Sequence, residues 1–419
     1  MSRRPHALVF SREYPPVVVG GTSTAARNLA VGLVEQHWDV SVVTTAPGAA
    51  VDTLEDLDGV SVQRVGTGSV YQARSGLADD ALRVHRRLLS AAEALADARA
   101  VDAVLLPDLF CYPEAALLAQ RRAVPLVNIL LQDFRGITPY DRDAHHVTTG
   151  VSAHHDHLVA LEEKSYRGSD HTAFISQALS DAITGYYGAD APHSTVYLGV
   201  DPTEIAAVQA EDGWAVARRE LLARTSQDRL LVAVGRLVPV KGFDHLLEAV
   251  RLLEPQGPGG AHLVLVGTGP EETHLRAKAA ALGLQDRVTF LTGIPRREAM
   301  GWMSVADVAV VPSLWESFCY VCAEMMALGR PVVATAVDSL RELLPDESVG
   351  YPVPVAGPLG ARRLRAGDLA ARIEEALADP AEAARRGAAA RARMLGTFTN
   401  ERFARGIAAI AAELVGTRS

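Results

Sequence analysis

Cysteine is scarce in this sequence, which has three among 419 residues. Cys111, Cys319 and Cys322 are too few to build a disulfide framework for a chain of this size. Long apolar runs are missing as well, since none approaches the roughly 18 residues of a membrane-spanning helix. The opening MSRRPHALVF has only four apolar residues in a row, too few for a signal peptide. We therefore expect a cytoplasmic protein without an integral membrane segment.

Positive charge is also in deficit. The chain has 41 lysines and arginines against 50 aspartates and glutamates, a formal net charge of −9. A nucleic-acid-binding protein needs a basic surface, so no nucleic-acid partner is expected. With 48% hydrophobic and 22% charged residues the composition is that of a folded globular protein, and the length predicts two domains.

Short apolar runs alternate with helical patterns, and the alternation starts again near the middle of the chain. We predict buried strands at 6–10, 38–45, 101–108, 124–133, 228–237, 261–269, 288–293, 306–313 and 330–335. Helices are predicted at 22–36, 81–98, 242–254 and 400–415, the first with Thr22 or Ser23 as its N-cap. This alternation favours an α/β fold with two doubly wound parallel sheets.

Ligands of such sheets bind beyond the carboxyl ends of the strands, so the functional residues are expected there. Gly20 and Gly21 precede a predicted helix start, where backbone amides can approach an anion. Gly235, Arg236 and Lys241 follow the strand at 228–237, and two cations there suit a diphosphate. By itself, the glycine pair is more typical of an ordinary turn, and the two cations are more typical of surface charge. The stretch VGTGPEE at 266–272 lacks the third glycine of a dinucleotide-binding fingerprint.

The stretch PSLWESFCYVCAEMMALGRPVVA places Glu316 and Glu324 eight positions apart around the start of a helix that we expect near Phe318. Carboxylates and free helix amides together can hold hydroxyl and phosphate groups. Alone, the two glutamates would be solvated helix charges. Cys319 and Cys322 form C-x-x-C, but neither a thioredoxin-like context nor further metal ligands are evident, so we expect them to pack in the interior.

Taken together, these segments resemble the retaining glycosyltransferases of family 4, which have the GT-B fold of two Rossmann-like domains facing across a cleft. The stretch from Glu316 to Glu324 is similar to the E-x7-E signature of that family. VGRLVPVKGF, LVGTGP, VTFLTG and TVYLGVD fit the neighbouring landmarks in the expected order, and SREYPPVVVGG is similar to the start of glycogen-synthase-type members.

The resemblance implies a metal-independent enzyme without a cofactor, in which Arg236, Lys241 and Glu316 are catalytic. The two cations would stabilise the departing nucleoside diphosphate. Glu324 would hold the ribose and Glu316 the donor sugar. The remaining donor-binding residues implied in this way are Gly20, Gly21, Gln132, Gly235, Phe318, Cys319 and Tyr320. The donor would be a UDP- or GDP-linked sugar.

Three positions depart from the family pattern. Cys319 replaces a glycine, Gln132 a histidine and Leu198 an asparagine. These departures put a common glucose or mannose donor in doubt.

The segment 143–166 is rich in histidine and in acidic groups. It could bind metal, contact the acceptor or be an uncommitted surface loop, and its charge suggests an acceptor that carries an amine. The acceptor-side candidates are Asp133, Asp141, His154 and His155.

We therefore expect a retaining glycosyltransferase that moves a hexose-type sugar to a small polar acceptor, with a homodimer as the candidate assembly. The expected domains are 1–196 for the acceptor and 197–399 for the donor, with a last helix at 400–419 packed on the first. Three alternatives stay open: a glucan synthase, a nucleotide-sugar epimerase and a non-catalytic nucleotide-sugar binder.

Overall fold

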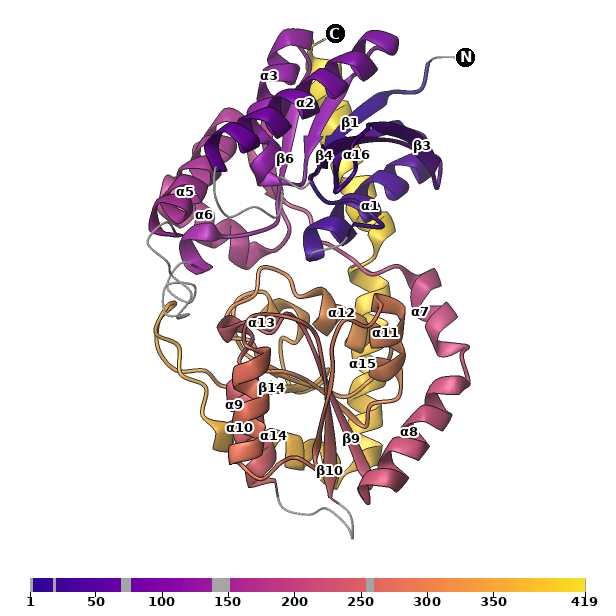
Figure 1. The fold of residues 1–419 in the computed structure, drawn as a ribbon, viewed down its shortest axis with the longest axis vertical. Helices are drawn as coiled ribbons and strands as arrows, with labels where there is room; N and C mark the ends of the chain where they lie inside the picture. Colours follow the sequence, from indigo (N-terminus) through magenta and orange to yellow (C-terminus); the bar gives the residue numbers. More distant parts are fainter. Residues whose placement is uncertain (1–2, 18–19, 69–76, 138–150, 254–259, 419) are drawn as a thin grey trace. The chain divides into compact units, whose positions relative to one another are not determined.

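The computed structural model describes residues 3–17, 20–68, 77–137, 151–253 and 260–418, and Figure 1 shows their course. The chain divides into two compact units. The first contains Met1–Phe134, Gly150–Leu198 and Asn400–Ser419, and the second contains Arg135–Thr149 and Gly199–Thr399. Each unit is a sheet covered by helices, so the α/β fold with two parallel-sheet domains is confirmed.

The first unit is built on an eight-stranded sheet in the order β3-β4-β2-β1-β5-β6-β7-β8. All neighbours pair in parallel except β3 and β4, which are antiparallel. The strands are β1 (His6–Phe10), β2 (Asp39–Pro47), β3 (Thr53–Leu57), β4 (Val60–Gly68), β5 (Ala103–Leu106), β6 (Leu126–Leu130), β7 (His171–Phe174) and β8 (His193–Thr195).

Helices from both ends of the chain cover this sheet. They are α1 (Gly21–Glu35), α2 (Leu77–Ala98), η2 (Leu109–Cys111), α3 (Tyr112–Arg122), α5 (Val151–Gly168), α6 (Gln177–Tyr187) and α16 (Asn400–Arg418). The last helix, α16, lies against α1 (Figure 1). A Cβ atom on Gly32 of α1 would lie 2.5 Å from the Cβ atom of Ala404, so only glycine permits this approach.

The second unit has a six-stranded, fully parallel sheet in the order β11-β10-β9-β12-β13-β14. Its strands are β9 (Arg229–Val234), β10 (Ala261–Val266), β11 (Val288–Leu291), β12 (Val308–Val311), β13 (Val332–Thr335) and β14 (Tyr351–Val353). Its helices are α7 (Pro202–Gln209), α8 (Gly213–Thr225), η3 (Pro239–Lys241), α9 (Phe243–Leu252), α10 (Glu272–Ala281), α11 (Arg296–Ser304), α12 (Tyr320–Ala327), α13 (Leu340–Leu343), α14 (Ala366–Ala378) and α15 (Pro380–Thr397).

The central strands are apolar on both faces because helices cover both sides of a parallel sheet. Every residue of β10 and β12 is buried, and Leu231, Leu263 and Val310 belong to one large core cluster of the second unit. A smaller cluster in the first unit includes Leu8 and Leu106.

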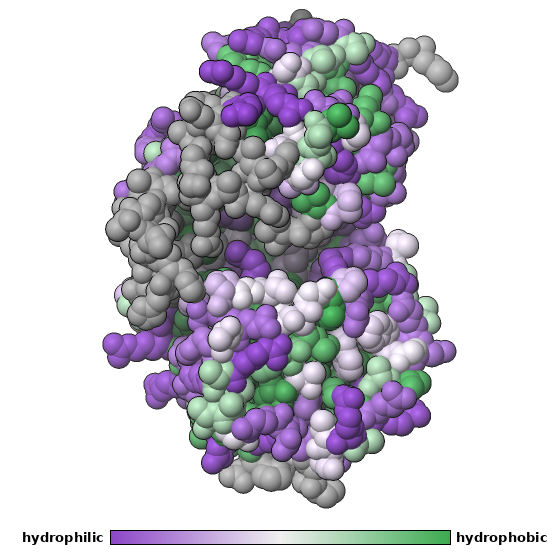
Figure 2. Space-filling model, viewed as in Figure 1, coloured by the Kyte–Doolittle hydropathy of each residue, from purple (hydrophilic) through white to green (hydrophobic). Residues whose placement is uncertain are grey.

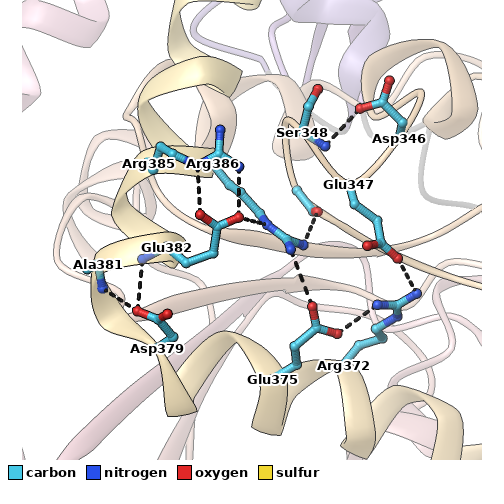
Figure 3. A network of polar contacts seen from close by, with 11 residues as sticks. Asp346, Glu347, Ser348, Arg372, Glu375, Asp379, Ala381, Glu382, Arg385 and Arg386 are labelled. Carbon is cyan, nitrogen blue, oxygen red and sulfur yellow. Dashed lines mark hydrogen bonds and ion pairs between the residues drawn. The ribbon is translucent and has the colours of Figure 1, made fainter.

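A network of charged side chains joins α14 to α15 and to the loop before β14 (Figure 3). Glu382 of α15 pairs with Arg385 at 2.6 Å and with Arg386 at 2.8 Å. Arg386 reaches Glu375 of α14, and Arg372 joins Glu375 to Glu347 of the loop. These contacts hold the end of α14, the start of α15 and the loop together on the surface.

Several local predictions were incomplete or wrong. The strands β3, β4, β7, β8 and β14 were not predicted. The strand β3 is a polar, exposed edge strand, β7 has four residues, and β8 and β14 have three each. The expected N-cap of α1 was wrong: the cap is Gly20, and the Ser23 hydroxyl donates to the Val17 carbonyl at 3.1 Å. The helix α12 begins at Tyr320, two residues later than expected, so Glu324 lies about one turn inside it.

The surface mixes polar and apolar residues, and Figure 2 shows hydrophilic and hydrophobic groups interspersed over the face that it draws. The exposed large hydrophobic side chains Val51, Leu54, Val216 and Leu252 belong to different elements or loops. Among the described residues, no helix is both long enough and apolar enough to cross a bilayer.

Candidate active site

The loop between β9 and α9 carries the two cations predicted to bind a diphosphate. Gly235 and Arg236 follow β9 directly, and the Arg236 side chain is exposed. Lys241 closes the short helix η3, and Gly242 then caps α9 with a left-handed backbone at φ +67°. The turn therefore returns the chain to the carboxyl edge of the sheet within a few residues.

This loop packs against the loop that follows β12, the neighbouring strand. The Leu314 amide donates to the Val240 carbonyl at 2.7 Å. A Cβ atom on Gly242 would lie 2.1 Å from the Pro312 carbonyl oxygen, which leaves no room for a side chain. Because β9 and β12 are adjacent and parallel, their carboxyl ends bring Lys241 and Glu316 to the same edge.

The glycines of VGTG support the loop after β9 from its other side. A Cβ atom on Gly267 would lie 1.8 Å from the Gly235 carbonyl oxygen, and one on Gly269 would lie 2.3 Å from that of Leu237. The amide of Leu237 donates to Thr268 at 2.8 Å. These glycines thus allow two loops to pack closely.

Glu316 lies at the centre of the polar contacts at this edge. Its Oε1 atom accepts from Lys241 Nζ at 2.6 Å and from Ser313 Oγ at 2.7 Å, and the side chain is 7% exposed. The Ser339 hydroxyl donates to the Glu316 carbonyl at 3.1 Å, and the Glu316 amide donates to Asp338 at 3.3 Å. Both the carboxylate and the backbone of Glu316 are therefore held in place.

Asp338 is itself fixed by an arginine. Both oxygens of its carboxylate accept from Arg362, at 2.5 and 2.6 Å. Arg362 also donates to the Leu314 carbonyl at 2.7 Å, so one guanidinium joins the loop after β12 to the loop after β13. Such a two-pronged pair restricts orientation as well as distance.

Cys319 precedes α12 in a conformation that favours glycine. Its backbone has φ +76° and ψ +76°, in the left-handed region that L side chains rarely adopt. The neighbouring Phe318 ring is buried and contacts the Tyr320 ring edge-to-face, with centroids 5.5 Å apart. Residues 317–319 therefore form a tight turn directly before the first amides of α12.

The C-x-x-C cysteines are part of the packing around α12. Cys322 is buried, and its sulfur lies 3.9 Å from that of Met326. Burial raises the pKa of the Cys319 thiol well above its usual range and raises that of Cys322 as well. Among the described residues, no three histidine, cysteine, aspartate or glutamate side chains are placed to share a metal ion.

Glu324 forms a second buried acidic contact on α12. Its carboxylate accepts from the Arg296 guanidinium at 2.5 Å, and Arg296 also pairs with Glu204. Burial raises the pKa of the Glu324 carboxyl, and Arg296 opposes that rise. Burial alone would lower the pKa of Arg296, but the charges of Glu324 and Glu204 outweigh it and raise the pKa.

In the first unit, the predicted residues lie beyond the carboxyl ends of β1 and β6. Gly20 caps α1, and a Cβ atom there would meet nothing within 4 Å, while Gly21 is the first residue of the helix. Gln132 follows β6 and is exposed. Asp133 is buried and accepts from the Tyr186 hydroxyl at 3.3 Å. Gln132 is therefore open to a ligand, whereas Asp133 is buried and takes part in a hydrogen bond within the first unit.

The acidic segment after β6 is only partly described. Asp141 lies outside the described residues, and so do the side chains of His154 and His155 at the start of α5. Glu162 is fully buried, where its carboxylate accepts from the Phe134 amide at 2.6 Å and the Tyr187 hydroxyl at 2.9 Å. Glu162 therefore stabilises the fold. It does not add to an acidic surface for a cationic acceptor, which the acidity of the segment suggested.

Sequence reasoning missed the partners that position the two glutamates. Ser313 lies three residues before Glu316, and this spacing within one loop was a signal that could have indicated it. Arg296, Asp338 and Arg362 come from distant parts of the chain, and no spacing in the sequence relates them to Glu316 or Glu324. The edge of the second sheet thus combines exposed Arg236, paired Lys241 and two buried carboxylates, which can bind phosphate and hydroxyl groups together.

Both halves of the chain match known enzyme families. Residues 20–199 match the family described as glycosyl transferase 4-like domain, and residues 218–393 match the family described as glycosyl transferases group 1. The glycogen synthase of Mycobacterium tuberculosis (strain H37Rv) is 28% identical over 410 residues, which cover 93% of this chain and 90% of that protein. A D-inositol 3-phosphate glycosyltransferase of Xylanimonas cellulosilytica is 33% identical over 204 residues, 47% of this chain and 48% of that protein.

Solved structures share the fold over the whole chain. Sucrose-phosphate synthase from Thermosynechococcus elongatus has a TM-score of 0.78 at 23% identity and covers 99% of this chain and 100% of its own. HepE from Anabaena, solved with UDP and glucose, has a TM-score of 0.71 at 20% identity and covers 98% and 100%. With both halves matched to glycosyltransferase domains, the chain is a glycosyltransferase with the GT-B fold.

Proposed function

We propose that this glycosyltransferase moves a hexose-type sugar from a nucleoside-diphosphate sugar to a small polar acceptor, with retention of configuration and without a metal ion. One observation carries the proposal: Lys241, Ser313 and Glu316 meet at the shared edge of β9 and β12, beside exposed Arg236. A departing diphosphate builds up negative charge, and fixed cations aimed at it lower the barrier. Arg236 and Lys241 would supply that charge.

The two glutamates would divide the recognition of the donor between them. Glu316, held by Lys241 and Ser313, would accept hydroxyls of the sugar, and Glu324 on α12 would accept hydroxyls of the ribose. Burial raises the pKa of Glu324 and Arg296 opposes that rise, which favours the ionised form that can accept from two hydroxyls. The amides that begin α12 would face phosphate or sugar oxygens.

The nucleotide is proposed to be a uridine diphosphate. HepE was solved with UDP and with UDP-glucose, and the E. coli trehalose-6-phosphate structure with UDP-2-fluoro glucose. The sugar stays open, because Cys319 carries a side chain beside the amides where the family has glycine. The acceptor is proposed to bind to the first unit. That the acceptor carries an amine stays a prediction from the acidity of the segment 143–166, to which buried Glu162 does not contribute.

A glucan synthase is the second candidate. The glycogen synthase of Mycobacterium tuberculosis matches over 93% of this chain, whereas the inositol-phosphate relative matches over 47%. Growth of a polymer would give a ladder of products, whereas transfer to a small acceptor would give a single product.

The first test is calorimetric titration with UDP, GDP, ADP and TDP in the presence of a chelator. We expect UDP to bind and Glu324→Ala to weaken that binding at least tenfold, since one charge-assisted pair of hydrogen bonds is lost. Ser313→Ala serves as the control, because it leaves the proposed ribose contact intact and should bind UDP nearly as well as the wild type. Strict dependence on a divalent cation, or equal weakening by both variants, would count against the proposal.

Transfer from a UDP-sugar tests the chemical roles. Lys241→Ala should lower kcat by about 100-fold or more, because a cation aimed at the leaving group is lost. Ser313→Ala removes one of the two contacts that hold Glu316, so a smaller loss is expected. Nuclear magnetic resonance of the product reports the anomeric configuration, and an inverted product would refute retention. Isomerised donor formed without an acceptor would identify an epimerase instead.

A further inference from the structure

A pocket of about 450 Å³ lies at the opposite edge of the second sheet, where β9, β12 and β13 begin. Its wall includes the residues before these strands and one face of α15. Arg229 begins β9, Asp307 precedes β12, and Arg330 precedes β13. Arg391 of α15 and Gln209 at the end of α7 complete the polar part of the wall.

This pocket is separate from the candidate active site. The strands of the second sheet are all parallel, so their first residues lie at one edge and the loops with Lys241 and Glu316 at the other. Helix α12 runs between the two edges. It begins beside Cys319 and ends at Ala327, next to the pocket residue Leu328.

The pocket has an excess of positive charge, because its arginines outnumber the acidic side chains in its wall. Asp307 is the one acidic side chain in the wall, and it accepts from Arg218 at 2.6 Å and from the Leu230 amide at 2.7 Å. Within the part of the chain that the structure describes, Arg229 has no side-chain partner, and Arg330 makes one long contact, to the Ala306 carbonyl at 3.4 Å.

Arg330 is the most telling of these groups. Its Nε atom is buried and has no hydrogen-bond partner among the described residues. Burial lowers the pKa of this guanidinium, which Asp307 only partly offsets. Among the described residues, the terminal nitrogens of Arg330 make only the long contact to Ala306, so they can donate to an acceptor in the pocket.

The shape of the donors indicates which anion fits. Guanidinium groups present their N–H donors in a planar fork that matches phosphate oxygens in pairs. Arg391 is already used by Gln209 at 2.8 Å and the Ala327 carbonyl at 2.6 Å, so it contributes charge and holds the end of α12. The rest of the wall is largely apolar, with Leu328, Pro331, Leu377, Pro380 and several alanines.

We propose that this pocket binds a small organic phosphate, with the phosphate on Arg229 and Arg330 and the organic part against the apolar wall. A volume of about 450 Å³ exceeds the needs of an inorganic phosphate and suits a small ligand. The site is independent of the proposed donor and acceptor.

The test is calorimetric titration with inorganic phosphate and with phenyl phosphate, carried out in an Arg236→Ala/Lys241→Ala background. That background removes the cations proposed for the donor, so phosphate binding there reports another site. We expect one phenyl phosphate to bind per chain, more tightly than inorganic phosphate because of the apolar wall. Arg229→Gln and Arg330→Gln should each weaken binding about tenfold or more.

Arg219→Gln is the matched control, because Arg219 is an exposed arginine of α8 that does not line the pocket. It should bind phenyl phosphate as tightly as the background protein. Thermal unfolding of each variant checks that the second unit is folded, and Arg229→Gln keeps the test valid if Arg330→Gln is unstable. Absence of saturable binding in the background protein, or equal weakening by Arg219→Gln, would overturn the proposal.

Discussion

At the scale of single residues, the candidate active site depends on side chains that hold other side chains. Glu316 accepts from Lys241 and Ser313, and Glu324 accepts from Arg296. A carboxylate held by two donors loses little orientational freedom when a substrate binds, which is an advantage of a preorganised site. Backbone strain occurs at Cys319 in the same loop, because this residue has a side chain and yet adopts a left-handed conformation with φ +76°.

Replacing Cys319 by glycine should stabilise the second unit by about 1 kcal/mol, since the left-handed backbone costs an L residue roughly that much. Urea unfolding followed by tryptophan fluorescence is a suitable measurement, because Trp214, Trp302 and Trp315 lie in the second unit. Cys322→Ala is the control: removing the sulfur of this buried helical residue should lower the free energy of unfolding. A destabilised Cys319→Gly would show that the side chain contributes more through packing than its backbone costs.

At the scale of elements, short loops between strand and helix bring the site together. η3 and Gly242 return the chain after β9 toward the loop after β12, and Gly267 and Gly269 let the next loop support it. These glycines are needed because backbone atoms of neighbouring loops occupy the space that a Cβ atom would take.

Gly242→Ala should destabilise the second unit by on the order of 3 kcal/mol and lower transfer activity. Its Cβ atom would lie 2.1 Å from the Pro312 carbonyl oxygen, so the two loops must separate and Lys241 must move away from Glu316. Gly283→Ala isolates the backbone contribution, since Gly283 has φ +69° but nothing within 4 Å of the added atom. Its expected cost is about 1 kcal/mol with activity unchanged. Equal costs for the two variants in urea unfolding would refute the steric explanation.

At the scale of the whole molecule, buried histidines make each unit sensitive to acid. His262 of β10 is buried and contacts the Thr289 hydroxyl at 2.8 Å, and burial lowers the pKa of its imidazole from 6.5 to about 4. Burial also lowers the pKa values of His6 and His171 in the first unit. When a folded-state pKa lies below its unfolded value, the unfolded chain binds the proton first.

Stability of the second unit should therefore fall as pH drops from about 6.5 toward 4. A pKa shift of this size corresponds to a loss of about 3 kcal/mol in the free energy of unfolding from His262 alone. His262→Gln, which keeps a hydrogen-bonding group beside Thr289, should show a shallower loss of stability over the same range. Urea unfolding at several pH values provides the comparison. Parallel pH profiles for the wild type and His262→Gln would show that the histidine is not responsible.

Pattern in the sequence was enough for the class of fold and for the kind of enzyme. Apolar runs of strand length alternating with helical periods indicate parallel sheets because helices cover both faces of such sheets and bury their central strands. The spacing of Glu316 and Glu324, together with Arg236 and Lys241, identified the loops at one edge of the second sheet. Local spacing could do this because these residues stand directly after strands or on one helix.

The partners of those residues depended on the tertiary structure. Arg296 reaches Glu324 across 28 positions, and Arg362 fixes Asp338 across 24. The pocket with Arg229, Arg330 and Arg391 likewise joins segments that lie far apart in the chain. No periodicity links such residues, because they meet only where separate strands and helices pack. Edge strand β3 escaped prediction for a related reason: it is stabilised by pairing with β4, not by burial of its own side chains.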